Sequence, residues 1–475
     1  MTVSGGVPET REGPLRVPGD APEQEHEGDR RRTPGAPVGA LPRGAIAYVL
    51  TAFPRLSETF IASEIHRLEQ RGLRLRLFVL KSDDPSEPHP VVGRITARPD
   101  YLPPTTSLSG TPLLRWLAGN LPAFLPGLLR TARRRPLGVA RAAWAALCQS
   151  LRARRPGAWP PKVYVKDFLR ASEVADRLHT AGDVRHLHAH FCHGTTTVTW
   201  LASMMSGIPF SFTAHARDLY NESLNPAGLL ERKLRAARFA VTCTEANRTH
   251  LMRIANGVPV HRVYHGLNAD LAHLLHETRA AAVPADRTVR ALGVGRLVPK
   301  KGFDVLVDAC AVLRRAGLAV DATIAGQEGS HAAEVRRRIA FHGLSDAVHL
   351  AGPLAQTALL REYRRATVFC LPCRVAEDGD RDGIPNVLVE AMACGLPVVT
   401  TPVSGIPELV ADGETGLIVP PDDPEALAAA VMRLHRDPAL ARRLGRAAEA
   451  LVRERFDGEQ LATMLATLFW PLVAA

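Results

Sequence analysis

The sequence predicts an α/β protein built from two doubly wound parallel sheets, and three observations lead to this fold class. The chain has 475 residues, which is too many for one ordinary hydrophobic core and suits two α/β domains. Short apolar runs of strand length alternate with helical stretches, as in parallel strands joined by crossover helices. The alternation breaks off in a polar, alanine-rich stretch and starts afresh after residue 285, so we expect a second sheet there.

The N-terminal segment and the first domain differ sharply in composition. Residues 1–43 contain seven prolines, seven glycines and no aromatic residue, which indicates a disordered tail. The first domain is expected over 44–285. It opens with the apolar run GAIAYVL from Gly44 and a helix over 57–71 that ends at Gly72. Further strand-like runs are LRLRLFVL, HLHAHF, PFSFTAH, RFAVTCT and HRVYHG.

The second domain is expected over 286–455. It begins with the strand RALGVGRL at 290–297 and a helix with one apolar face that stops at Gly317. Residues 456–475 are predicted to form a helix that packs back on the first domain. In open parallel sheets, ligands bind beyond the carboxyl ends of the strands, so the sequence predicts two Rossmann-like domains facing a shared cleft.

Composition restricts the class of protein. Hydrophobic residues make up 46% of the chain and charged residues 23%, which is a globular balance. The seven cysteines are odd in number and scattered, which favours reduced thiols and a cytoplasmic protein. No uninterrupted apolar stretch is long enough to span a bilayer, and the N-terminus lacks the apolar core of a secretion signal.

The net charge of +11 comes from one segment. Residues 101–166 hold nine arginines, two lysines and no acidic residue, interleaved with leucine and tryptophan. Such a segment either lies on an anionic membrane surface, with the protein peripheral at the inner face of the cell membrane, or forms a helical insertion packed on the first domain. Nucleic acid is disfavoured, because interleaved aromatic platforms and known binding motifs are missing.

Three motifs carry a family resemblance. They are GRLVPKKG at 295–302, RDGIPNVLVEAMACGLPVV at 381–399 and PVSGIPELVADGETGLIVPPDDPEAL at 402–427. Together they resemble the retaining GT-B nucleotide-sugar glycosyltransferases of the family-4 type, the glycosyl transferases group 1, over about residues 44–455. The FPxxSETF pattern in TAFPRLSETFIASEI at 51–65 is similar to transferases of exopolysaccharide and colanic-acid biosynthesis.

The resemblance implies a reaction and its partners. A hexose would move from a UDP- or GDP-linked donor to a glycan or lipid-linked acceptor with retention of configuration, as in bacterial exopolysaccharide biosynthesis. No cofactor and no metal ion are expected. A sugar-nucleotide epimerase or a phosphorylase-like enzyme of the same fold is the alternative, and a basic nucleic-acid-binding protein is a remote one.

The donor site is predicted mainly in the motif at 381–399. A helix that begins after Pro385 presents free backbone amides, and because proline has no N–H, Asn386 and Val387 are the donors suited to a diphosphate. The resemblance assigns the ribose hydroxyls to Glu390 and the donor sugar to Asp382, where the family usually has glutamate. Gly383 and Gly295 are counted with the donor-binding residues.

The catalytic residues are predicted beside the donor. Arg296 and Lys301 match the family's diphosphate-binding pair, since two cations can neutralise a leaving diphosphate, whereas Lys300 is expected to be a solvated turn residue. The resemblance also places His215, which follows a strand, near the reacting carbon. Arg296, Lys301, Asp382 and His215 therefore form the predicted catalytic set.

Acceptor contacts and metal ligands are the least defined predictions. Ser57, Glu58 and Thr59 replace a glycine-rich loop of many family members, and Ser57 is also a helix cap by its position. His186, His188 and His190 project from one strand face but lack an evident carboxylate partner. A metal site is therefore not predicted, and His190 is expected to line the cleft.

Overall fold

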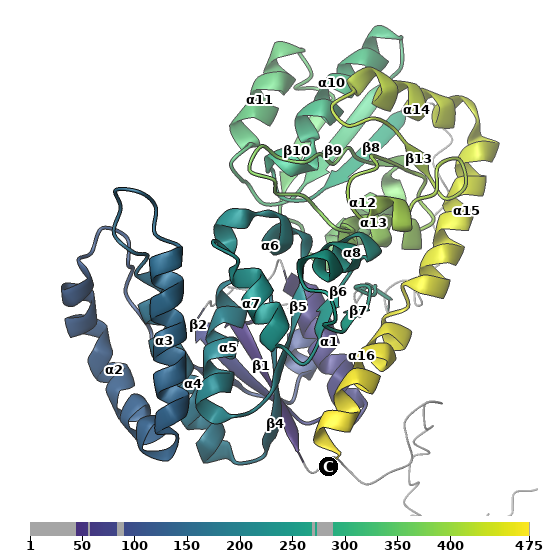
Figure 1. Ribbon diagram of the computed structural model, residues 1–475. Coiled ribbons are helices and arrows are strands. Elements are labelled where there is room, and N and C mark those ends of the chain that lie inside the picture. The colour runs from purple at the N-terminus through teal and green to yellow at the C-terminus, as the bar shows by residue number, and fades with distance from the viewer. Residues whose placement is uncertain (1–43, 56–57, 83–89, 268–270, 273–287, 475) are drawn as a thin grey trace, which may run out of the picture. The chain divides into compact units, whose positions relative to one another are not determined.

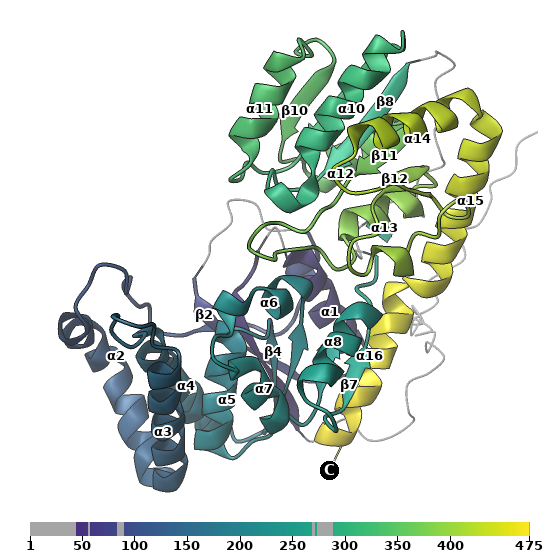
Figure 2. The same ribbon diagram turned by 45° about the horizontal axis from the view of Figure 1, so that its top comes forward.

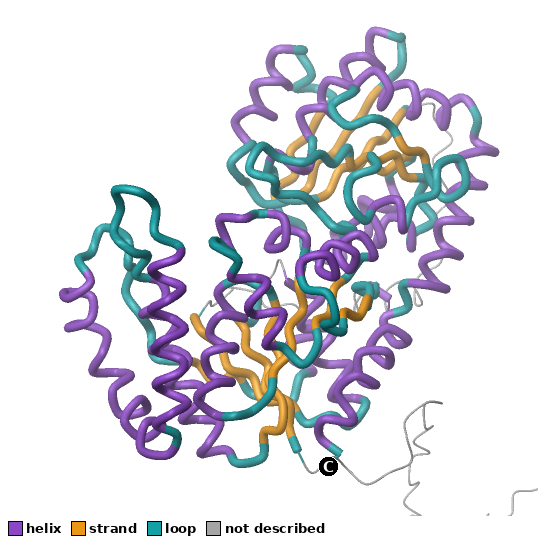
Figure 3. The backbone as a smooth tube through the Cα atoms, viewed as in Figure 1, coloured by secondary structure: helices purple, strands orange, loops and turns teal. Residues whose placement is uncertain are grey.

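The fold is described by a computed structural model that covers residues 44–55, 58–82, 90–267, 271–272 and 288–474. The expected tail, the domain boundary near residue 285 and Ser57 lie outside the described residues. Within the described part, two parallel sheets are each flanked by helices (Figure 1), so the predicted fold class is confirmed. Figure 3 shows how helices and loops follow the strands in alternation.

The first sheet has the strand order β3-β2-β1-β4-β5-β6-β7, and all its strand pairs are parallel. Its strands are β1 (Ala45–Ala52), β2 (Leu75–Lys81), β3 (Pro99–Tyr101), β4 (Val184–His190), β5 (Phe210–Ala214), β6 (Ala240–Thr242) and β7 (Val260–Arg262). Its helices are α1 (Thr59–Gln70), η2 (Pro90–Arg94), α2 (Leu113–Arg134), α3 (Pro136–Arg152), α4 (Val163–Ala181), α5 (Gly194–Ser206), α6 (Ala216–Tyr220), η3 (Glu222–Leu224), α7 (Leu229–Ala236) and α8 (Glu245–Ile254).

The second sheet has the order β10-β9-β8-β11-β12-β13. Its strands are β8 (Val289–Val294), β9 (Val320–Ala325), β10 (Val348–Gly352), β11 (Val368–Leu371), β12 (Val398–Thr400) and β13 (Leu417–Ile418). Its helices are η4 (Pro299–Lys301), α10 (Phe303–Arg315), α11 (Ala332–Phe341), α12 (Gln356–Arg365), α13 (Asn386–Ala393), η5 (Ile406–Glu408), α14 (Pro424–Arg436) and α15 (Pro438–Arg455). β8 and β11 are neighbours at the point where the strand order reverses, which is the usual ligand position in such sheets.

The strands are apolar on both faces because helices cover both faces of a parallel sheet. In β1, seven of the eight residues are buried. Packing of this kind explains why the apolar runs of the sequence read as continuous rather than alternating.

The last helix, α16 (Gly458–Val473), packs on the first sheet's layer. Phe469 is buried against Tyr48 of β1, and the Arg67 guanidinium of α1 donates to Glu459 at 2.8 Å. In Figure 1, α15 and α16 are drawn in yellow and lead from α13 to α1. Helices α15 and α16 therefore lead the chain from the second sheet back to the first.

The basic segment forms the helices α2 and α3, which Figure 2 shows as a hairpin beside α4 and α5. Trp116 and Phe124 of α2 are buried with Leu169 of α4. A Cβ atom at Gly138 of α3 would lie 2.5 Å from the carbonyl oxygen of Met204 in α5, so only glycine permits this approach. No helix among the described residues has the length and hydropathy needed to cross a membrane.

Candidate functional site

Lys301 and Asp382 form an ion pair at the carboxyl ends of β8 and β11. Lys301 Nζ lies 2.7 Å from Asp382 Oδ2. Burial alone favours the neutral acid, but the positive charges of Lys301 and Lys300 outweigh it and hold the pKa of Asp382 well below its usual range. A Cβ atom at Gly295 would lie 3.1 Å from Lys301 Cε, so glycine leaves the lysine stem room to reach Asp382. The pair therefore keeps an ionised carboxylate beside a fixed ammonium group.

Lys300 is not the solvated turn residue that the sequence predicted. Its side chain is buried, and its Nζ lies 3.0 Å from Asp380 Oδ1 and 3.3 Å from Asp382 Oδ1. The prediction was wrong because both carboxylates come from a loop that follows β11 and is distant in the sequence. Two lysines, not one, hold this acidic loop.

Arg296 stands apart from these pairs. Its side chain is exposed, and no carboxylate partner for it exists among the residues that the structure describes. Burial and the charge of Arg296 lower the pKa of Lys301, but the negative charge and hydrogen bond of Asp382 outweigh them, so this pKa is raised. Arg296 is thus a cation available to an anionic ligand at the end of β8.

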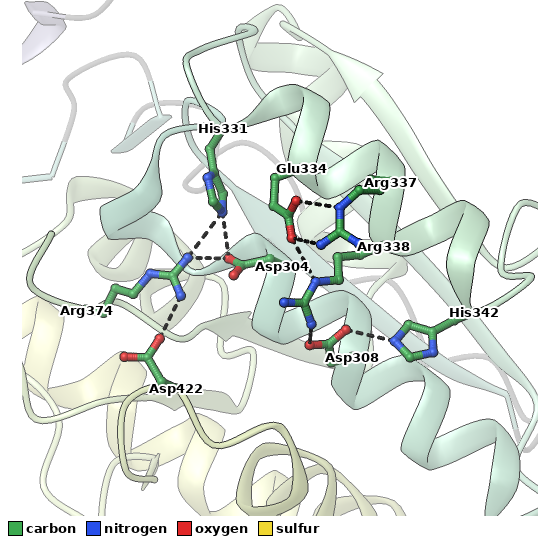
Figure 4. Close-up of polar contacts among 9 residues, drawn as sticks. All are labelled: Asp304, Asp308, His331, Glu334, Arg337, Arg338, His342, Arg374 and Asp422. Carbon is green, nitrogen blue, oxygen red and sulfur yellow. Dashed lines mark hydrogen bonds and ion pairs between the residues drawn. The ribbon is translucent and has the colours of Figure 1, made fainter. Parts of the chain in front are cut away.

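The η4 turn that carries the lysines is held by Arg374, a residue that the sequence did not single out. Figure 4 shows Arg374 between Asp304, Asp422 and His331. Its guanidinium lies 2.5 Å from Asp304 Oδ1 and 2.6 Å from Asp422 Oδ1, and its Nε donates to the carbonyl oxygen of Pro299 at 2.8 Å. This scaffold fixes the backbone from which Lys301 extends.

The helix α13 begins without a side-chain cap. Pro385 occupies the N-cap, and the first backbone hydrogen bonds run from Leu388 and Val389 to its carbonyl oxygen. The amides of Asn386 and Val387 precede these bonds, so they are free for an anion at the positive end of the helix dipole. The first turn contains no acidic residue that would compete with such an anion.

Glu390 lies one turn further along α13 and is buried. Tyr363 donates its hydroxyl to Glu390 Oε2 at 3.0 Å. Burial raises the pKa of Glu390 to about 7, and the hydrogen bond from Tyr363 offsets only part of this effect. A buried carboxylate with one fixed donor retains free acceptor positions for further hydroxyl groups.

His215 follows β5 and is oriented from both sides. Its backbone N–H donates to Asp218 Oδ1 at 2.9 Å, and its Nδ1 lies 3.3 Å from His265 Nε2. Its Nε2 atom is buried and has no hydrogen-bond partner among the described residues. Burial and the neighbouring histidines hold the pKa of His215 well below its usual value, so the ring is neutral at pH 7. A neutral ring with one free nitrogen is suited to hydrogen bonding with a ligand.

Loops of the two sheets meet at this site. A Cβ atom at Gly383 would lie 3.3 Å from Thr244 Cγ2 and 3.7 Å from Ala216 Cβ, which places Gly383 against the residue after His215. Asn386 lies beside Cys243 and His265. The acidic loop, the start of α13 and the histidine pair therefore border one region.

Glu408 of η5 is a second link between the sheets' loops. Its carboxylate accepts the backbone N–H groups of Glu245 at 2.8 Å and Ala246 at 3.0 Å, at the start of α8. The hydroxyl of Tyr264 donates to the same carboxylate at 3.0 Å. Glu408 lies in the predicted motif at 402–427, but its role as a cap of a helix from the other layer had no signal in the sequence.

His190, which the sequence predicts to line the cleft, is buried beside His215. Its side chain is 1% exposed, and its Nε2 lies 3.0 Å from Glu64 Oε1 of α1, which also accepts the Tyr48 hydroxyl at 2.7 Å. Its ring stacks on His215 at 5.8 Å between centroids. The ring of His190 thus packs against the ring of His215 and helps to fix its orientation. Glu64 is thus a carboxylate partner of His190 for which the sequence has no local signal.

The other histidines of β4 are also accounted for by hydrogen bonds. His188 is paired through Nδ1 with Ser211 at 2.8 Å and through Nε2 with Thr213 at 3.0 Å. His186 Nε2 is paired with the same Ser211 hydroxyl at 2.8 Å. Although donor atoms of Glu64, His188 and His190 lie within 4.8 Å of one another, hydroxyl groups occupy both nitrogens of His188. We therefore assign these side chains to a buried polar network.

The acceptor residues predicted at 57–59 remain predictions. Glu58 precedes α1, and its carboxylate lies 2.6 Å from the Arg55 guanidinium. Thr59 is the first residue of α1. The next residue of α1, Phe60, packs its ring against His215 and His265, with ring centroids 5.3 Å and 4.4 Å apart.

Sequence comparisons match the chain to glycosyltransferases. A family model described as glycosyl transferases group 1 matches residues 276–451. An amylovoran biosynthesis glycosyltransferase of Erwinia amylovora is 40% identical over 184 residues, which cover 38% of this chain and 45% of that relative. A protein of Salmonella typhimurium named for colanic acid biosynthesis is 27% identical over 89% of this chain and 100% of its own. A D-inositol 3-phosphate glycosyltransferase of Streptomyces bingchenggensis is 30% identical over 61% and 67%.

Solved structures define the class of fold. A sucrose-phosphate synthase from Thermosynechococcus elongatus superposes with a TM-score of 0.63 at 21% identity, covering 91% of this chain and 100% of that one. Anabaena HepE, in complex with UDP and glucose, gives 0.61 at 17% identity over 90% and 99%. The fold is that of the GT-B glycosyltransferases. The chain belongs to the glycosyl transferases group 1 family.

Proposed function

We propose that this glycosyltransferase moves a hexose from a UDP- or GDP-linked donor to a glycan or lipid-linked acceptor with retention of configuration. The observation that carries the proposal is the arrangement of Arg296, the Lys301–Asp382 pair and the uncapped start of α13 near His215. Cations and free helix amides are the groups that proteins use to bind a diphosphate.

The donor's parts correspond to particular residues. The diphosphate would lie between Arg296 or Lys301 and the amides of Asn386 and Val387, and Glu390 would accept hydrogen bonds from the ribose hydroxyls. Asp382, held ionised by the lysines, would accept hydrogen bonds from the hexose. Preorganised charge of this kind stabilises a leaving diphosphate by ~3 kcal/mol per group.

The proposed reaction replaces one bond at the anomeric carbon by another on the same face. The bond from that carbon to the diphosphate oxygen breaks as the acceptor oxygen attaches, and the acceptor proton passes to the departing phosphate oxygen. His215 would orient the hexose through its unpaired Nε2. This orienting role requires no proton transfer from His215, which agrees with the neutral state of its ring.

The relatives suggest where the acceptor belongs. Those named for amylovoran and colanic acid biosynthesis support a role in the assembly of a bacterial exopolysaccharide. An epimerase of the same fold would turn over its sugar nucleotide without an acceptor, whereas a transferase requires one or transfers to water.

A panel of UDP- and GDP-sugars tests the proposal. The wild-type protein should be stabilised against heat by UDP or GDP and should slowly hydrolyse at least one donor of the matching base. Glu390→Ala should remove the stabilisation by the nucleotide. Stabilisation by neither nucleotide, or an epimerised donor in the absence of any acceptor, would refute the transferase proposal.

We also propose that the protein binds the anionic inner face of the cell membrane through α3. Leu137, Trp144, Leu147 and Leu151 recur at helical spacing, and all four side chains are exposed, Trp144 by 66%. The opposite face of α3, with Gly138, Ala142 and Ala146, is buried. An exposed apolar stripe on a packed helix is the pattern of a surface-bound helix.

Charge complementarity supports an anionic bilayer as the occupant of this face. Arg141 and Arg152 flank the stripe, and neither has a carboxylate partner among the residues that the structure describes. Arg155, which follows α3, is likewise exposed and has no carboxylate partner among the described residues. Each such arginine near anionic lipid contributes about 1 kcal/mol. A membrane-bound α3 would hold a lipid-linked acceptor close to the first domain.

A further inference from the structure

A cavity of about 460 Å³ opens in the layer of the first sheet. It lies between the segment after α3, the start of α4, the start of α5 and the loop around η3. Its volume is within the range of cavities that bind small molecules. Its lining includes Arg155, Trp159, Tyr164, Asp167, His193 and Thr197. None of these residues belongs to the proposed donor site.

Asp167 is an unpaired carboxylate in this lining. It is 5% exposed, and no hydrogen bond or ion pair is made by its side chain to any described residue. Burial raises its pKa to about 6 in spite of the positive charges of Lys166 and Arg170 nearby. A buried carboxylate without a partner costs stability. Such a cost is expected where a ligand supplies the missing donors.

His193 connects the cavity to the catalytic histidine. It is the N-cap of α5, and its Nδ1 lies 3.6 Å from Asp218 Oδ2. The other oxygen of Asp218 accepts the backbone N–H of His215 at 2.9 Å. The rings of Phe191 and His215 lie 4.6 Å apart, and those of Phe191 and His193 lie 5.8 Å apart. One carboxylate therefore separates the lining of the cavity from the residue that would contact the donor hexose.

The rest of the lining suits a sugar. Tyr164 and Trp159 offer aromatic faces, against which the C–H face of a sugar ring packs. Thr197 donates its hydroxyl to the carbonyl oxygen of His193 at 3.3 Å and accepts from Lys233 Nζ at 3.3 Å, so it fixes this wall of the cavity. Arg155 adds a cation at the end nearest α3, where the phosphate of a lipid-linked sugar would approach.

We propose that this cavity binds the acceptor sugar, with Asp167 accepting hydrogen bonds from its hydroxyl groups and His193 orienting it toward His215. This inference rests on the proposed function, because it presumes that a glycosyl group is transferred. It adds residues of α4 and of the start of α5 to the acceptor site.

The test uses p-nitrophenyl glycosides of glucose, galactose and mannose as acceptor probes with the full-length protein. Binding is measured by saturation-transfer difference NMR, and transfer is measured by mass spectrometry with the UDP- or GDP-sugar that the enzyme hydrolyses. Asp167→Asn keeps the shape of the side chain and removes its charge. We expect it to weaken binding of the probe by about tenfold or more, with hydrolysis of the donor changed by less than about twofold.

Glu222→Gln is the matched control, because it removes a carboxylate beside the lining residue Ser223 without being part of the lining. Probe binding should be unchanged in this variant. The cavity proposal is overturned if no probe binds a wild-type protein that UDP or GDP stabilises, or if Asp167→Asn binds the probe as well as the wild type does. If neither nucleotide stabilises the wild type, the proposed function itself fails, and the cavity proposal fails with it.

Discussion

The Oδ2 atom of Asp382 lies 2.7 Å from the Nζ atom of Lys301. This carboxylate therefore neutralises the cations of the site in the absence of a ligand. Replacing it by asparagine leaves Lys300 and Lys301, whose side chains are 7% and 13% exposed, with less compensation, because only Asp380 remains near Lys300. A buried ion pair that loses one partner is destabilised by several kcal/mol.

We expect Asp382→Asn to unfold at a temperature several degrees below that of the wild type. Its stabilisation by UDP or GDP should be larger than in the wild type, because the diphosphate supplies the missing negative charge. Hexose transfer should fall by about 100-fold, because the hexose loses the carboxylate that accepts its hydrogen bonds. Differential scanning calorimetry with and without nucleotide measures the first two effects, and an equal nucleotide shift in both proteins would contradict the electrostatic argument.

The raised pKa of Glu390 predicts that the free energy of unfolding depends on pH. Its pKa is raised to about 7 in the folded protein, above its ordinary value of 4.5. The stability that this group contributes is therefore complete below its unfolded pKa and is lost as the pH rises through about 7. Glu390→Gln removes this loss. The variant should be more stable than the wild type at pH 8 by on the order of 3 kcal/mol and close to it at pH 4.

The same substitution should impair nucleotide binding. The ionised carboxylate is the better acceptor for ribose hydroxyls, so the wild type should bind UDP or GDP more tightly as the pH rises from 6 to 8. Glu390→Gln should lose this pH dependence. Urea unfolding at the two pH values and isothermal titration of the nucleotide check both effects, and a variant less stable than the wild type at pH 8 would disprove the sign.

His215 should act on the hexose and not on the nucleotide. We expect His215→Ala to reduce transfer by about 10- to 100-fold through loss of one hydrogen bond in the transition state, with an unchanged thermal shift by UDP or GDP. Because burial keeps its pKa well below the usual value, activity should not fall between pH 7.5 and 6.5 through this group. Loss of the nucleotide shift in His215→Ala would place the residue at the diphosphate instead.

The sequence predicted the sheets and the start of α13 because their signals are local. Apolar runs mark buried parallel strands, and the missing N–H of Pro385 marks the free start of α13. Contacts between distant loops leave no such signal. The prediction that Lys300 is solvated was wrong for this reason, because its partners Asp380 and Asp382 follow another strand.

Residues that hold site residues in place could not be predicted from the sequence for the same reason, because their partners are distant in the chain. Glu64 pairs with His190 across 126 positions, and Arg374 holds the carbonyl oxygen of Pro299 across 75. Asp167 is a charged residue in an ordinary helix pattern, and only the packing of α4 against its neighbours reveals that it is buried. Burial of a charge depends on tertiary contacts, so a helix pattern alone does not disclose it.

The exposed stripe of α3 predicts binding to anionic vesicles. The wild type should sediment with vesicles of phosphatidylglycerol and phosphatidylcholine, and much less with phosphatidylcholine alone. Trp144→Ser combined with Leu147→Ser removes about 2 kcal/mol of apolar contact, which corresponds to about 30-fold weaker binding. Phe341→Ser is the matched control, because this side chain is also exposed but lies on α11 of the other layer.

Charge and apolar contact should be separable in this experiment. Arg141→Gln with Arg152→Gln should weaken binding to the anionic vesicles and reduce its dependence on salt, because fewer cations meet the lipid phosphates. Donor hydrolysis should remain at the wild-type rate in both double variants, since α3 contributes no residue to the donor site. If the Trp144 and Leu147 variant sediments like the wild type, α3 is a solvated insertion and the acceptor reaches the cavity without a membrane contact on this face.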